Sequence, residues 1–133
     1  MPLAQGVSSA ADSLATLADA GVDIFHCSTR RFWEPEFEAS ALNLAGWTRK
    51  LSGKPVITVG SVSLDKDMVA AFRGQKAAIT GIDHLIEMFA RDEVDLVAVG
   101  RALLVDPAWA TKVRENRMQD LLPFTPEALR SLS

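Results

Sequence analysis

Short apolar strands alternate with helical segments along this chain, and the alternation limits the folds it can adopt. The predicted strands are Val22–Ser28, Val56–Val59 and Asp95–Val99, at intervals of roughly 30–40 residues. The first is nearly continuous in apolar residues, as in strands buried on both faces. Helical crossovers make such strands parallel, in either an open α/β sheet or a (β/α) barrel. Three strands are too few to close a barrel.

The helical segments are marked by apolar residues at three- and four-residue spacings. The stripes are Ala10, Leu14, Leu17 and Ala18; Leu44, Trp47 and Leu51; Met68, Val69 and Phe72; and Ile82, Leu85, Ile86 and Phe89. We expect the first helix to begin near Ser8 or Ser9, and Asp65 to cap the third. Asp106-Pro107 and Thr125-Pro126 are strong signals for two further helix starts.

Composition excludes several classes of function. The 133 residues include 14 Lys and Arg against 17 Asp and Glu, a formal net charge of −3, and 48% are hydrophobic. We therefore expect one globular domain over residues 1–133, with no electrostatic reason to bind nucleic acid or a membrane surface. One cysteine and two histidines argue against a metal site. The first 25 residues lack Lys and Arg, and no apolar run reaches about 18 residues, so we expect a cytoplasmic protein.

Two predicted strands end in glycine followed by a polar residue, as Gly60-Ser61 and Gly100-Arg101. A glycine here lets the backbone approach a ligand closely, and the N–H groups beyond it can hold a phosphate. Arg101 would add a planar set of donors and a permanent positive charge. In the alternative interpretation both glycines make tight turns and Arg101 pairs with a carboxylate. The pattern alone leaves both interpretations open.

The segment Cys27–Trp33 leaves the end of the first predicted strand and contains two arginines and two aromatic residues. Such a segment can line a site for an anionic or planar ligand. Composition favours another interpretation, in which the aromatic side chains cover the edge of the core and Arg30 and Arg31 pair with nearby glutamates.

Residue types that often perform catalysis have structural interpretations in this chain. We expect His26 in the core, because it lies inside a strand pattern, and His84 on the surface of a helix's first turn. Cys27 has no nearby helix start to lower its pKa, so we expect a structural role. The carboxylates lack the spacing of an acid/base pair. We therefore assign no catalytic residue.

Three segments resemble, in order and approximate spacing, the last three strand regions of the old yellow enzyme family, which are FMN-dependent NAD(P)H oxidoreductases and ene-reductases. The segments are His26–Trp33, Pro55–Val62 and Leu96–Pro107. The similarity extends from about Ala15 to Leu129. The family folds as a (β/α)8 TIM barrel with FMN at its carboxyl mouth. The resemblance therefore implies that this chain is the C-terminal part of such a barrel, with about three βα units.

The resemblance also implies roles for individual residues. Gly60, Ser61 and Val62 match a loop whose backbone contacts the FMN phosphate in the family. Gly100 and Arg101 match the last-strand pair on the same phosphate, with Arg101 also lying against the flavin. FMN is the implied cofactor, NADH or NADPH the implied reductant, and an activated C=C bond, as in an enone, the implied substrate.

The family's catalytic residues are not part of this resemblance. Its substrate-activating His/Asn or His/His pair and its tyrosine proton donor belong to earlier strands. This chain has no tyrosine, and neither His26 nor His84 matches the pair. Turnover would then need a companion chain that supplies the first barrel half. A homo-oligomer is the other partner that we consider. The alternatives are a stand-alone module that binds a phosphorylated ligand without catalysis, and a truncated remnant without function.

Overall fold

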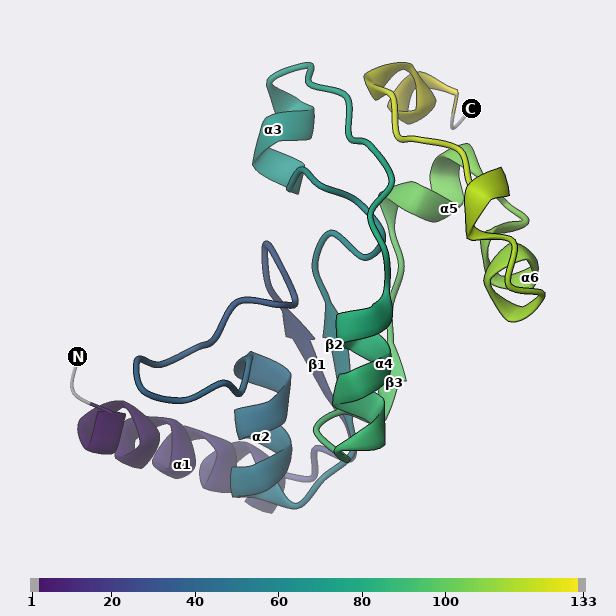
Figure 1. Ribbon diagram of the computed structural model, residues 1–133. Helices are drawn as coiled ribbons and strands as arrows, with labels where there is room; N and C mark the ends of the chain where they lie inside the picture. The colour runs from purple at the N-terminus through teal and green to yellow at the C-terminus, as the bar shows by residue number, and fades with distance from the viewer. Residues whose placement is uncertain (1–2, 132–133) are drawn as a thin grey trace.

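The computed structural model describes residues 3–131 and shows a mixed α/β architecture around a small open sheet (Figure 1). The strands are β1 (Phe25–Ser28), β2 (Val56–Val59) and β3 (Leu96–Val97). All are parallel, in the order β1-β2-β3. The prediction of a parallel α/β sheet is confirmed, and β2 has the predicted bounds.

The helices occur in the predicted order, with differences in extent. They are α1 (Leu3–Asp19), α2 (Leu44–Ser52), α3 (Met68–Phe72), α4 (Asp83–Ala90), α5 (Arg101–Val105) and α6 (Trp109–Arg114), followed by the 3-10 helices η1 (Met118–Asp120) and η2 (Pro126–Arg130). The first helix therefore begins before Ser8, and α5 was not predicted. Asp65 does not cap α3, because Asp67 lies directly before that helix and accepts the backbone N–H of Ala70. The Asp65 carboxylate instead accepts the backbone N–H of Ala78.

The two faces of the sheet differ in what covers them. Helix α2 packs against β1 and β2, and its cap Asn43 donates to Thr58 Oγ1 at 3.1 Å, so the Thr58 side is buried. On the opposite face His26, Ile57 and Leu96 lie side by side in register. His26 is exposed there, and Leu96 is 51% exposed. The sheet thus has one covered and one open face.

This difference corrects two expectations for the first strand. The run Val22–Ser28 was expected to be buried on both faces, whereas β1 starts at Phe25 and alternates in burial. His26 was expected in the core, and that prediction is wrong because no element covers its face within residues 3–131. Cys27 points to the covered face, where burial raises the pKa of its thiol, in agreement with a structural role.

Asn43 joins three parts of the fold around the covered face. Its side-chain oxygen accepts the N–H of Gly46 at 2.8 Å and caps α2. Its amide nitrogen donates to the carbonyl of Phe32 at 2.8 Å, in addition to the contact with Thr58. The β1–α2 loop is therefore fixed to both the helix and the sheet.

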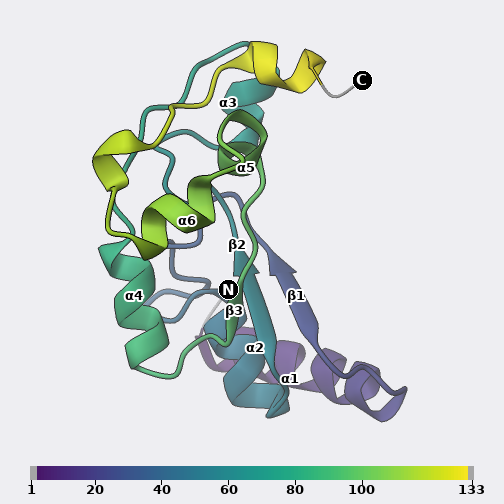
Figure 2. The same cartoon turned by 90° about the vertical axis from the view of Figure 1, so that its right-hand side faces the viewer.

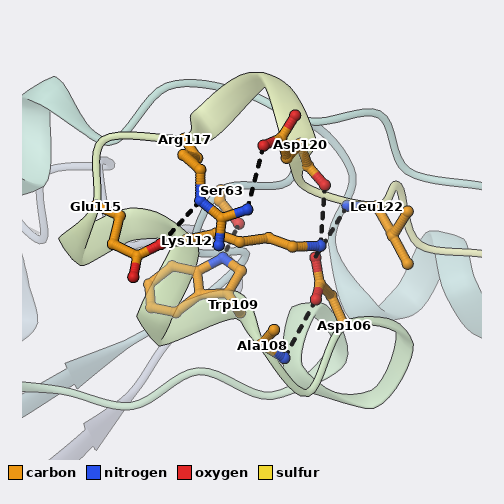
Figure 3. A network of polar contacts seen from close by, with 9 residues as sticks. All are labelled: Ser63, Asp106, Ala108, Trp109, Lys112, Glu115, Arg117, Asp120 and Leu122. Atoms are coloured by element: carbon orange, nitrogen blue, oxygen red, sulfur yellow. Dashed lines mark hydrogen bonds and ion pairs between the residues drawn. The ribbon is translucent and has the colours of Figure 1, made fainter.

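The chain beyond β3 is held by a polar network centred on Asp106 (Figure 3). The Asp106 carboxylate is 2% exposed and accepts Lys112 Nζ at 2.9 Å and the N–H groups of Ala108 and Leu122, each at 3.2 Å. Trp109 Nε1 donates to Ser63 Oγ at 3.0 Å, which ties α6 to the loop after β2. The network brings the C-terminal segment back over α6.

Asp106→Asn is expected to destabilise the fold in a pH-dependent way. The Lys112 hydrogen bond is the main cause of the lowered pKa of Asp106 in the fold. A lowered folded-state pKa stabilises the fold above the unfolded pKa of about 4, and this contribution is lost as pH falls through the folded value. The free energy of unfolding, measured with urea, should differ most between wild type and variant near neutral pH, and the difference should shrink in acid. Exposed Asp12 provides the control variant Asp12→Asn, and an equal gap at every pH would contradict the prediction.

Candidate functional site

A cavity of about 710 Å³ lies at the carboxyl ends of the three strands. Its wall includes residues at and after the strand ends, in the ranges 28–30, 59–62 and 99–104, together with Met68 of α3 and Leu129 of η2. In Figure 1 and Figure 2, α3, α5 and the yellow segment that contains η2 lie beyond the strand ends. The wall is mainly apolar with a few polar groups, as in sites for small molecules.

All five residues predicted to contact a phosphate lie in this cavity wall. They are Gly60, Ser61, Val62, Gly100 and Arg101. They come from the loops after β2 and β3, which meet because the carboxyl ends of parallel strands share one edge of a sheet. Arg101 Nη2 donates to Ser61 Oγ at 3.2 Å and connects the two loops directly. The structure therefore gathers the predicted residues into one place.

Arg101 is the buried cation of the cavity, at 8% exposure. Besides Ser61, its guanidinium donates to the carbonyls of Lys66 at 2.6 Å and Asp67 at 3.2 Å, and it lies 5.3 Å from the ring centre of Phe124. Burial lowers its pKa, while the charge of Asp67 opposes that shift. No carboxylate of residues 3–131 forms an ion pair with it, so the alternative in which Arg101 is neutralised by a carboxylate is not what the structure shows. Three of its five N–H donors are used by these partners, which leaves donors and charge for a ligand.

The loop after β2 has an unusual backbone. Gly60, Ser61 and Ser63 have φ values of +147°, +55° and +60°. Positive φ costs a serine on the order of 1 kcal/mol or more, and such residues concentrate at functional sites. A Cβ at Gly60 would lie 2.5 Å from the carbonyl oxygen of Thr29. The loop's shape therefore depends on glycine at that position.

The two arginines after β1 have different surroundings: one forms ion pairs, and the other lines the cavity. Arg31 forms ion pairs with Glu34 at 3.0 Å and with Asp67 at 2.8 Å. Arg30 lines the cavity and forms no ion pair with the residues that the structure describes. Phe32 is buried in the core, which confirms for this residue that an aromatic side chain of the segment packs on the core. Pairing with a neighbouring glutamate is confirmed for Arg31 only.

The described cavity wall contains no histidine, cysteine or carboxylate that could act as a general acid or base. His84 is exposed in the first turn of α4, as predicted, and its ring centre lies 6.0 Å from that of Phe32. The described wall thus has groups that can hold a ligand and lacks a side chain that titrates near neutral pH.

Sequence reasoning missed several residues that shape the cavity. Thr29 belongs to the segment that the sequence indicated after the first strand, but its own contact was not predicted: its hydroxyl donates to the carbonyl of Val59 at 2.8 Å. Asp67 holds Arg101 but was passed over in favour of Asp65. Leu129 had no local signal, because its place depends on η2 packing against α5.

Comparison with known proteins gives no assignment. No protein-family model matches the chain, and no curated protein matches it. No helix within residues 3–131 combines the length and apolar character needed to cross a membrane. The geometry of the cavity and the sequence motifs are therefore the basis for a functional proposal.

Proposed function

We propose that this chain binds FMN through its phosphate and corresponds to the C-terminal part of an old yellow enzyme-type (β/α)8 barrel. The supporting observation is that Gly60–Val62 meets Gly100 and Arg101 in one cavity. These are the residues to which the sequence resemblance gives phosphate contacts. Their position at the strands' carboxyl ends is where parallel α/β folds bind ligands.

The chemistry of the wall fits the two halves of this ligand. Arg101 offers a permanent charge whose present partners are carbonyls and a hydroxyl, none of which cancels it. The apolar side chains of Val59, Val99 and Leu104 suit a planar ring system. A buried cation beside apolar side chains supports FMN as the ligand, because FMN carries both a phosphate and a planar ring system.

The open sheet supports the barrel part of the proposal. The face with His26, Ile57 and Leu96 is uncovered within the described chain, and β1 and β3 each have a sheet edge with no strand beside it there. Further βα units from a companion chain, or a second copy, would cover this face and extend the sheet. Bound FMN supplies hydride transfer from NADH or NADPH to an activated C=C bond. The companion would supply the tyrosine proton donor, a residue type that this chain does not contain.

A titration of the purified chain with FMN and riboflavin tests the proposal. Flavin fluorescence reports binding, and size-exclusion chromatography shows that the binding species is compact. Riboflavin lacks the phosphate, so FMN should bind about tenfold more tightly or better, because a charge-assisted hydrogen bond contributes about 1.5–3 kcal/mol. Equal affinities, or no binding by a compact chain, would overturn the proposal.

A second candidate is a binding module without catalysis, favoured by the lack of acid/base side chains in the wall. Inorganic phosphate and ribose 5-phosphate distinguish the two candidates. Competition with FMN by ribose 5-phosphate at equal affinity would favour the module. Much weaker competition would favour a flavin site, because the ring then contributes its own share of the binding.

A further inference from the structure

Asp67 is a buried carboxylate at the border of the cavity. It is 5% exposed, and its side chain accepts the N–H of Ala70 at 3.0 Å and forms an ion pair with Arg31 Nη2 at 2.8 Å. Its backbone carbonyl accepts Arg101 Nη1 at 3.2 Å. One residue thus connects α3, the loop after β1 and the cation of the cavity.

A negative charge in this position works against anion binding. The hydrogen bond from Ala70 is the main cause of the lowered pKa of Asp67, and the charges of Arg31 and Arg30 lower it further, so the carboxylate is ionised at neutral pH. Its charge reaches Arg101, whose pKa it raises against the effect of burial. Left uncompensated, Asp67 would repel a phosphate at Arg101 and offset part of the cation's attraction.

Arg31 is placed to remove this conflict. It forms the close ion pair with Asp67, while its own side chain is not part of the cavity wall. Its second partner, Glu34, is exposed and contacts Nη1, whereas Asp67 contacts Nη2. Arg30 adds positive charge but forms no ion pair with Asp67.

We infer that Arg31 is a positioning residue for phosphate binding, because its ion pair with Asp67 neutralises that carboxylate and leaves the charge of Arg101 available to the ligand. The inference rests on the proposed function. Arg31 would then raise the affinity for the anion through Asp67, without touching the anion itself.

A double-mutant cycle in the full chain tests the inference, with FMN and riboflavin as probes. Arg31→Met should weaken FMN binding by about fivefold to tenfold, because it exposes Arg101 to an uncompensated charge. Riboflavin binding should not change. Adding Asp67→Asn to Arg31→Met should restore FMN affinity to within about twofold, since asparagine caps a helix as well as aspartate but carries no charge. A purely structural role for the pair would show no such rescue.

Two further variants separate charge from shape. Arg31→Lys keeps the charge and should retain most of the FMN affinity, and Glu34→Gln removes only the exposed partner and should have little effect. Unchanged FMN affinity in Arg31→Met, while Arg101→Met loses it, would overturn the inference and leave the proposed function standing. Failure of Asp67→Asn to rescue would also overturn it. A wild-type chain that binds FMN and riboflavin equally would overturn both.

Discussion

FMN affinity is expected to fall by about tenfold or more when Arg101 is replaced by methionine, because the phosphate loses a charge-assisted contact worth about 1.5–3 kcal/mol. The guanidinium is the buried cation of the cavity, and its bonds to the carbonyls of Lys66 and Asp67 fix its orientation before a ligand arrives. Methionine keeps much of the length of the side chain and removes its charge and donors. Fluorescence titration gives the dissociation constant directly.

The controls for this variant follow from the structure. Riboflavin serves as an internal control, because its affinity should change far less than that of FMN. Arg30→Met removes an exposed cation from the same wall and should cost clearly less than Arg101→Met. Arg101 also bonds to Ser61, so urea unfolding must show that the variant is folded. Unchanged FMN affinity in a folded Arg101→Met chain would contradict the phosphate assignment.

The sequence was sufficient to predict the features that depend on local pattern and strand direction. The β-branched run Val56–Val59 is a strand with those bounds. Gly60 and Gly100 lie in one cavity because the carboxyl ends of parallel strands share one edge of the sheet. The alternation of strands and helices in the sequence was enough to predict that the strands are parallel. The residues of the site that follow strands were therefore within reach of sequence reasoning.

The features that could not be predicted depend on which element packs against which. His26 and Ile86 lie in apolar patterns, yet His26 is exposed and Ile86 is 55% exposed, because burial requires a covering element and the pattern does not say whether one is present. Asp65 and Asp67 both precede α3, and only Asp67 is placed to pair with Arg31 from a distant loop. Long-range contacts of this kind decide between two residues of the same type.

Gly60→Ala is expected to lower the free energy of unfolding by about 2–4 kcal/mol, from backbone strain and overpacking together. The φ of +147° is unfavourable for alanine, and its Cβ would lie 2.5 Å from the Thr29 carbonyl oxygen and 3.0 Å from the Phe32 nitrogen. These neighbours cannot easily move, because both are held by backbone hydrogen bonds. The Phe32 N–H donates to the Gly60 carbonyl at 3.0 Å, and the Thr29 N–H donates to the Val59 carbonyl at 3.2 Å. Urea unfolding measures the loss.

Gly81→Ala is the matched control, because a Cβ at Gly81 meets no atom within 4 Å. Its effect on stability should stay within about 1 kcal/mol. Equal stabilities for Gly60→Ala and Gly81→Ala would contradict the close contact between the loops after β1 and β2. A loss of FMN binding in Gly60→Ala would follow from the displaced loop as well as from any lost phosphate contact. Arg101→Met, whose backbone is under no such strain, is therefore the variant that separates ligand binding from the shape of the site.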